Sequence, residues 1–296
     1  MGTLFGYHLA EFCDVTMLDR NHELLEVIGQ QGLSVNDGEP RRIAVAKHPA
    51  QLFGSAVLFL FVKAVDTLQA LRPFAGQLNP ATPIVSLQNG VGNEDAIKTA
   101  LGGAVAVVLG ITTESSLSTG PGRARSSESG STILGSGGAA PDTSKRMVQL
   151  LADSGLHASV VYDIRPHLWG KLVANAAINA ISALLDCEAG VIAQNADTAR
   201  LAQSIAQEAA QVAAGMKINL PYSDPWQYVT EVIEIGADSK SSMAFDLEMG
   251  HQTEIDHING AITAAGRRIG VRTPYNDAMV RLIRGREALL KVPVRL

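Results

Sequence analysis

The sequence predicts an α/β protein in two parts, a doubly wound, mostly parallel sheet followed by an all-helical half. In the first half, short apolar runs that end at turn residues alternate with helical patterns, as is typical of strands buried on both faces of a parallel sheet. After residue 163 the strand signals end and nearly every segment has a helical pattern. At 296 residues the chain is long enough for two cores, so we expect one domain at 1–163 and a second at 164–296.

The elements of the first domain follow in order from these patterns. The chain opens with a short amphipathic helix, MGTLFGYHLAEF, and a strand, DVTMLDR. Further strands are expected at 56–62, 83–87, 104–112 and 158–163, and helices near 22–30, 65–78 and 93–101.

The segment 115–138 is rich in Ser and Gly and has short alternating pieces. A flexible loop is one interpretation. We favour a hairpin of antiparallel edge strands, 123–127 and 131–134, that closes the sheet.

In the second domain, Gly270 and Pro274 supply a stop between the last two helices. The expected helices cover 166–186, 196–216, 225–236, 241–266 and 276–290. A small substrate is expected in a cleft between the two domains.

The composition excludes several classes of protein. The net charge is −5, and neither clustered Lys/Arg nor frequent aromatic residues suggest a nucleic-acid partner. Cys13 and Cys187 lack metal-ligand spacing, so we expect no metal, no disulfide and a cytoplasmic protein. The longest apolar run, 168–185, contains one lysine and two asparagines, which favours a buried helix over a membrane span. The sequence leaves the oligomeric state open between a monomer and a homodimer.

The first helix and strand correspond to the second half of a dinucleotide-binding β-α-β unit. Gly2 stands where the last glycine of a GxGxxG turn would be, and Asp19 and Arg20 stand where a residue meets the adenosine ribose. The first strand and first glycines are missing, so we expect an N-terminally truncated Rossmann-like domain. An ordinary helix–strand pair of an α/β protein has the same appearance, so this half-motif alone is weak evidence for a nucleotide site.

A polar stripe runs along one predicted helix of the second domain. Lys171, Asn175 and Asn179 are spaced at i, i+4 and i+8 among apolar residues, hence on one face. The stripe is explained either by satisfied packing, with the lysine reaching water, or by catalysis. In an apolar cleft a lysine is a good proton donor to a carbonyl oxygen, since desolvation lowers its pKa.

Four other polar residues are candidates for the site, and each also has a structural interpretation. Lys63 and Asn89 end two predicted parallel strands, where ligands bind in open sheets, although lysines and Asn-Gly pairs are also common in turns. Glu254 lies on the predicted helix 241–266, where a solvated surface position is the alternative. Ser242, near the start of the same predicted helix, has the structural interpretation of a helix cap.

Together these segments resemble the ketopantoate reductase family, in family order and over essentially the whole chain. The matching pieces are GTLFGYHLAEF…DVTMLDR, FLFVKAVDT, PIVSLQNGVGNE, WGKLVANAAINAISALL, SSMAFDLE and TEIDHINGAI.

The resemblance implies NADPH-dependent reduction of 2-dehydropantoate to (R)-pantoate, a step toward pantothenate and coenzyme A. It implies that Lys171 is the general acid and that Glu254 orients the substrate and supports catalysis. Substrate contacts are implied for Asn89, Asn175, Asn179 and Ser242. Cofactor contacts are implied for Gly2, Arg20, Lys63 and Asn89, with Arg20 on the 2′-phosphate of NADPH.

Three departures from the family pattern leave other functions open. The glycine turn is incomplete, Asp19 precedes Arg20, and an asparagine that some members use for substrate has no match after Asn179. The alternatives are a reductase for another branched 2-keto acid, or an inactive relative that acts as a binding protein.

Overall fold

The computed structural model describes residues 1–103, 105–127, 129–137 and 141–290, and the chain divides into two compact units. Unit 1 comprises Met1–Gln88 and Asn93–Ile164, and unit 2 comprises Asn89–Gly92 and Arg165–Leu296. The Rossmann-like α/β first part and the helical second part predicted from the sequence are confirmed.

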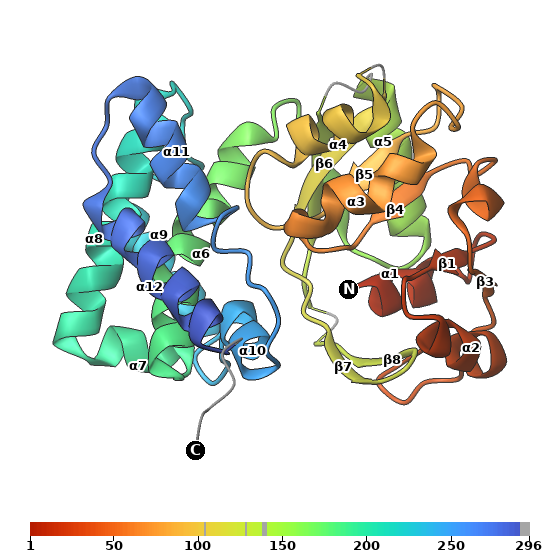
Figure 1. Cartoon of the computed structure of the whole chain (residues 1–296), viewed down its shortest axis with the longest axis horizontal. Helices are drawn as coiled ribbons and strands as arrows, with labels where there is room; N and C mark the ends of the chain where they lie inside the picture. Colours follow the sequence, from red (N-terminus) through yellow and green to blue (C-terminus); the bar gives the residue numbers. More distant parts are fainter. Residues whose placement is uncertain (104, 128, 138–140, 291–296) are drawn as a thin grey trace. The chain divides into compact units, whose positions relative to one another are not determined.

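The strands of unit 1 form three sheets, shown on the right of Figure 1. A five-stranded sheet has the order β10-β9-β6-β5-β4, and β4, β5 and β6 are parallel. Strands β1 and β3 form a parallel pair, and β2, β8 and β7 form a small third sheet. The bounds are β1 Thr16–Leu18, β2 Ser34–Val35, β3 Ala44–Ala46, β4 Leu58–Leu60, β5 Ile84–Ser86, β6 Val107–Thr112, β7 Leu117–Gly120, β8 Arg123–Arg125, β9 Thr132–Ser136 and β10 Ala158–Val160.

The predicted hairpin of 123–127 with 131–134 is wrong. Strand β8 pairs with β2 and β7, whereas β9 pairs antiparallel with β6 and parallel with β10. Strand β9 is largely buried because it lies inside the sheet, and the exposed β10 forms the edge. Ala104, the first residue of another predicted strand, lies outside the described residues.

Helices cover the five-stranded sheet of unit 1. In Figure 1, α3 and α4 lie side by side over β4, β5 and β6. Helices α1 and α5 contribute Leu4, Phe5 and Leu151 to a core with Val85 and Val108 of the sheet. The helix bounds are α1 Gly2–Leu9, α2 His22–Gln31, α3 Thr67–Leu71, α4 Asn93–Leu101 and α5 Pro141–Asp153, with 3-10 turns at Pro49–Leu52, Ala64–Asp66 and Arg72–Phe74.

Unit 2 is built around helix α6, Arg165–Leu185, which packs against α8, α9, α10 and α12. Several alanines of the two helices are fully buried, and such small side chains let α6 and α8 approach closely. They are Ala176, Ala177 and Ala180 of α6 and Ala202, Ala206, Ala209 and Ala213 of α8. The other bounds are α7 Ala189–Gln194, α8 Ala196–Gly215, α9 Pro225–Ile235, α10 Ser242–Glu248, α11 Asn259–Ile269 and α12 Pro274–Leu290.

Within the described residues, α6 is long and apolar enough to cross a membrane by length and composition. However, 72% of its most apolar window is buried inside the protein, as is typical of a core helix.

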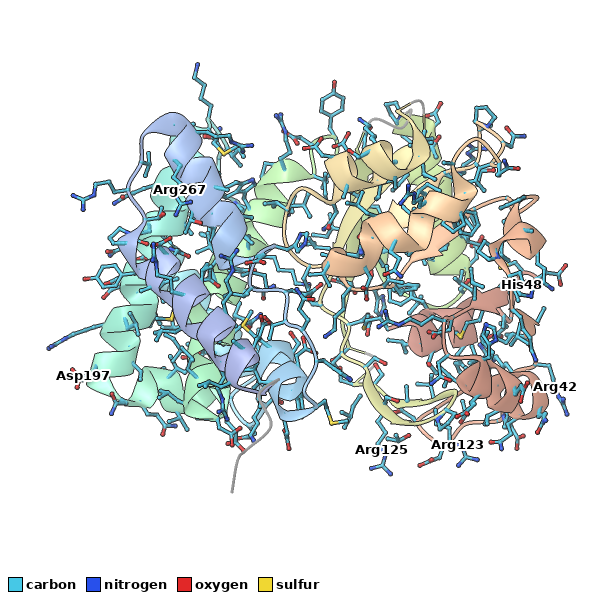
Figure 2. The ribbon with its side chains drawn as sticks, viewed as in Figure 1. Arg42, His48, Arg123, Arg125, Asp197 and Arg267 are labelled. Carbon is cyan, nitrogen blue, oxygen red and sulfur yellow. The ribbon has the colours of Figure 1, made fainter. Side chains whose placement is uncertain are left out.

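Exposed arginines of unit 1 project from the region of β3 and β8, as Figure 2 shows for Arg42, Arg123 and Arg125. Acidic side chains lie among them, since Arg125 is 3.6 Å from Asp37. This surface therefore carries charges of both signs.

Candidate functional site

Three of the predicted site residues form a chain of hydrogen bonds within unit 2. The Lys171 Nζ donates to Asn89 Oδ1 at 3.2 Å, and Asn89 Nδ2 donates to Glu254 Oε2 at 3.1 Å. These residues come from α6, from the segment Asn89–Gly92, and from the turn that precedes α11. The fold thus brings together an ammonium group, an amide and a carboxylate that are far apart in the sequence.

The chemistry of the three groups dictates how the Asn89 amide points. An ammonium group can only donate hydrogen bonds and an ionised carboxylate can only accept them. The Asn89 oxygen therefore faces Lys171 and its nitrogen faces Glu254, as the two distances show.

Burial lowers the pKa of Lys171 from its ordinary value to about 8, because desolvation disfavours the charged ammonium. The negative charge of Glu254 acts in the opposite direction and raises this pKa. A lysine with this pKa can give up a proton near neutral pH, which an exposed lysine does poorly.

The polar stripe predicted on one face of α6 lies within a single continuous helix. Asn175 is partly exposed, and Asn179 is buried with its backbone carbonyl accepting from Ser241 Oγ at 3.1 Å. The apolar side chains around the stripe belong to the core of unit 2.

The start of α10 differs from the expectation for Ser242. The capping residue is Ser241, whose Oγ accepts from Ala244 N at 3.1 Å, while Ser242 is the first helical residue and is exposed. Sequence reasoning missed Ser241, although a serine followed by a helical pattern is an ordinary N-cap signal.

The prediction that Glu254 lies on a helix from 241 to 266 is wrong. Helix α10 ends at Glu248, Gly250 adopts a positive φ of 68°, and α11 begins only at Asn259. Glu254 lies in the turn between them, where its backbone carbonyl accepts from His257 N and Ile258 N. The glycine in MGHQT was the available signal for this break.

Gly90 brings Asn89 to this turn by a close backbone approach. Its φ is +82°, and a Cβ at this position would lie 2.3 Å from the carbonyl oxygen of His257. Val91 N also donates to His257 O at 3.3 Å. The segment that carries Asn89 is therefore fastened to the turn that carries Glu254.

Three of the four predicted cofactor residues, Gly2, Arg20 and Lys63, lie in unit 1, whereas Asn89 belongs to unit 2. Gly2 begins α1, and Arg20 lies two residues after the end of β1, with its side chain 81% exposed. The Arg20 guanidinium is 3.7 Å from Asp66, an exposed pair of low energy. Asp19 Oδ1 accepts from Asn21 N at 2.8 Å, so this carboxylate is engaged with the backbone before α2.

Lys63 follows β4 and precedes a 3-10 turn, at the carboxyl end of the strand. Gln88, which sequence reasoning missed, follows β5 and hydrogen-bonds to the segment that follows β4. Its Nε2 donates to Val62 O and to Thr67 Oγ1, each at 2.8 Å.

The described part of the chain contains no group of three or more His, Cys, Asp or Glu residues that could hold a metal ion. The arrangement of Lys171, Asn89 and Glu254 is instead suited to proton transfer and to the recognition of a small polar molecule.

Comparison with known families gives two matches that together cover most of the chain. The family described as "Ketopantoate reductase PanE/ApbA" matches residues 1–138. The family described as "Ketopantoate reductase PanE/ApbA C terminal" matches residues 163–287.

Two similar proteins are each named 2-dehydropantoate 2-reductase. The protein from Archaeoglobus fulgidus is 34% identical, with 78% of this chain and 76% of that protein covered. The protein from Pyrobaculum aerophilum is 37% identical, with 77% of this chain and 76% of that protein covered.

Two solved structures are similar to this chain over nearly its whole length. A PanE/ApbA family ketopantoate reductase from Ralstonia eutropha has a TM-score of 0.89 at 25% identity, with 97% of this chain and 95% of that chain covered. D-mandelate dehydrogenase, solved with NADH and anilino(oxo)acetate, has a TM-score of 0.88 at 27% identity, with 99% and 97% covered.

Proposed function

This chain belongs to the ketopantoate reductase family, and from that membership we propose that it reduces 2-dehydropantoate to (R)-pantoate with NADPH. It is an oxidoreductase. The observation that carries the proposal is the Lys171–Asn89–Glu254 chain, which supplies a proton donor of lowered pKa beside two polar groups.

In the proposed reaction, Lys171 Nζ gives a proton to the carbonyl oxygen of the keto acid. When bound, the reduced nicotinamide supplies the hydride that the carbonyl carbon receives. Asn89 holds the ammonium through its oxygen, so that one N–H of Lys171 is fixed and another is directed to substrate. Glu254 accepts from Asn89 and supports the bound keto acid, together with Asn175, Asn179 and Ser242.

The cofactor residues present fit a nicotinamide dinucleotide with a 2′-phosphate. Arg20 is exposed at the end of β1 and has a fork of donors that matches a phosphate. The other proposed cofactor contacts are Gly2, at the start of α1, Lys63, after β4, and Asn89.

A second candidate function is the reduction of another 2-keto acid with NADH. Its support is the likeness to D-mandelate dehydrogenase, which was solved with NADH, and the presence of Asp19 beside Arg20. The two candidates share the proposed role of Lys171 and differ in cofactor and in the side chain of the substrate.

Initial rates with two keto acids and two cofactors distinguish these candidates. We expect the highest kcat/KM for 2-dehydropantoate with NADPH, and lower values for phenylglyoxylate, the keto acid of mandelate, and for NADH. A higher kcat/KM for phenylglyoxylate with NADH would favour the second candidate, and no oxidation of either cofactor would favour the inactive relative.

The variant Arg20→Ala tests the proposed cofactor. It should weaken the binding of NADPH by about 2 kcal/mol, because a charge-assisted contact is lost, and should leave the binding of NADH nearly unchanged. Equal weakening of both cofactors would contradict a phosphate contact at Arg20.

A further inference from the structure

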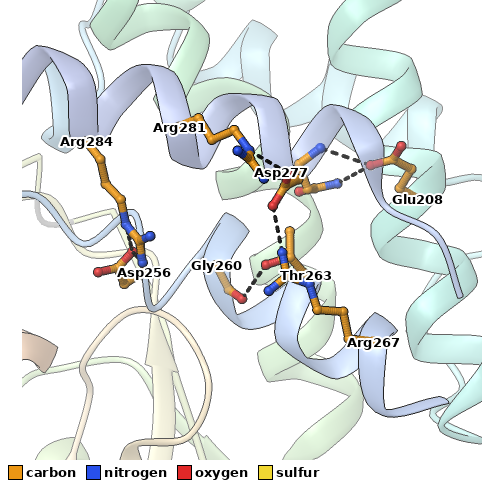
Figure 3. Close-up of polar contacts among 9 residues, drawn as sticks. Glu208, Asp256, Gly260, Thr263, Arg267, Asp277, Arg281 and Arg284 are labelled. Atoms are coloured by element: carbon orange, nitrogen blue, oxygen red, sulfur yellow. Dashed lines mark hydrogen bonds and ion pairs between the residues drawn. The ribbon is translucent and has the colours of Figure 1, made fainter. Parts of the chain in front are cut away.

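Helix α12 makes three polar contacts with the turn that carries Glu254. Glu287 Oε1 accepts from Thr253 N at 2.7 Å, Arg284 Nε donates to Asp256 Oδ1 at 2.9 Å, and Asn276 Oδ1 accepts from Asn259 Nδ2 at 3.1 Å. Figure 3 shows Arg284 reaching Asp256 from this helix. The turn is therefore held at its beginning, its middle and its end.

The contact at the beginning is made by a carboxylate and a buried residue. Thr253 is 1% exposed, and its Oγ1 accepts from Ile255 N at 3.2 Å. Glu254 lies between these two anchored positions. A hydrogen bond from a backbone N–H to a carboxylate is about twice as strong as a neutral one, so Glu287 fixes the direction in which the chain enters the turn.

The contact at the end belongs to a fully buried network. Asn259 and Asn276 are both 0% exposed, and Asn259 Nδ2 also donates to Ala176 O in α6 at 3.1 Å. Asn276 Nδ2 donates to Glu208 Oε2 at 2.9 Å. This end of the turn is thereby fixed to the helix that carries Lys171.

The ion pair in the middle of the turn contributes little to holding the turn in place. Arg284 and Asp256 are 60% and 42% exposed, and exposed ion pairs are worth at most about 1 kcal/mol. Among the three α12 residues that contact this region, Glu287 alone makes a charge-assisted hydrogen bond to the backbone of a buried residue. Its own side chain is partly exposed.

We propose that Glu287 is a positioning residue for Glu254, acting through Thr253 N to hold the Glu254 carboxylate at Asn89 Nδ2. The proposal rests on the proposed function, because Glu254 is there a substrate-supporting group. Glu287 lies on α12, which carries none of the site residues predicted from the sequence.

A double-mutant cycle tests the proposal. Glu287→Ala should lower kcat/KM for 2-dehydropantoate about ten-fold, with the same division between KM and kcat as Glu254→Ala. In the Glu254→Ala background, Glu287→Ala should cause no further loss, because the group that it positions is already gone. Glu287→Gln keeps an oxygen that accepts from Thr253 N, so it should restore most of kcat/KM.

Arg281→Ala is the matched control, since Arg281 also lies on α12 but pairs with Asp277, at 2.7 Å (Figure 3). It should leave kcat/KM within about two-fold of the unaltered protein. An equal loss from Glu287→Ala in both backgrounds, or no loss in either, would overturn the proposal.

Amide hydrogen exchange separates this proposal from the proposed function. Absence of 2-dehydropantoate turnover by the unaltered protein would contradict the function alone. The peptide that covers residues 253–259 should still exchange faster in Glu287→Ala than in Glu287→Gln or Arg281→Ala. Equal exchange in all three variants would overturn the positioning role whatever the substrate.

Discussion

Lys171→Ala should reduce kcat for 2-dehydropantoate by roughly 10²–10⁴-fold, the range for losing a positioned general acid. The ammonium of Lys171 is held by Asn89, and burial lowers its pKa to about 8, so the substitution removes both the position and the acidity of the proton donor. NADPH affinity should stay nearly unchanged, because Lys171 is not among the proposed cofactor residues, three of which, Gly2, Arg20 and Lys63, belong to unit 1. Steady-state kinetics together with a direct NADPH titration measure the two effects.

Lys240→Ala is the control for removing a lysine from unit 2. Lys240 Nζ lies 2.7 Å from the exposed Asp186, and this hydrogen bond raises its pKa, so it is a poor proton donor. Its removal should leave kcat nearly unchanged. Near-normal turnover in Lys171→Ala would mean that the polar stripe of α6 is satisfied packing, and the family would then account for the fold but no longer for the mechanism.

Gly90→Ala should impair both stability and catalysis. A non-glycine residue at a φ of +82° is strained by about 1–2 kcal/mol, and the added Cβ would lie 2.3 Å from His257 O. Because that carbonyl belongs to the backbone, the segment must move away and carry Asn89 from Lys171 and Glu254. We expect kcat/KM to fall at least about ten-fold, the cost of breaking two hydrogen bonds to charged groups.

Gly92→Ala separates the backbone strain of a positive φ from the steric clash of the added Cβ with His257 O. Gly92 has a similar φ of +91°, but a Cβ there would meet nothing within 4 Å. Urea unfolding should therefore show a loss of stability in both variants, whereas kcat/KM should fall strongly only in Gly90→Ala. Equal kinetics for the two variants would contradict a role of this close approach in placing Asn89.

The helical face of Lys171, Asn175 and Asn179 was predictable because helical spacing is a local property of the sequence. The grouping of Lys171 with Asn89 and of Asn89 with Glu254 was not, since these pairs are 82 and 165 residues apart. Only the tertiary fold fixes such contacts. The roles of the three residues remain predictions.

Local signals also failed where two structures compete for the same segment. The helical pattern continued through 241–266, yet Gly250 ends α10 and the chain forms a turn before α11. The segment around β8 and β9 has the composition of a hairpin, but each strand finds a longer-range partner, β2 for one and β6 for the other. Strand pairing is decided by burial across the sheet, which the local pattern does not contain.

The pH dependence of kcat/KM tests the central claim, that protonated Lys171 is the general acid, most directly. With NADPH saturating and 2-dehydropantoate varied, kcat/KM reports the protein before the keto acid binds. It should be constant at pH values well below 8 and should fall as pH rises through about 8, where Lys171 loses its proton. The residual kcat/KM of Lys171→Ala should lack this decline. A kcat/KM that stays constant well above pH 8 in the unaltered protein, or that declines in the same way in Lys171→Ala, would contradict the account.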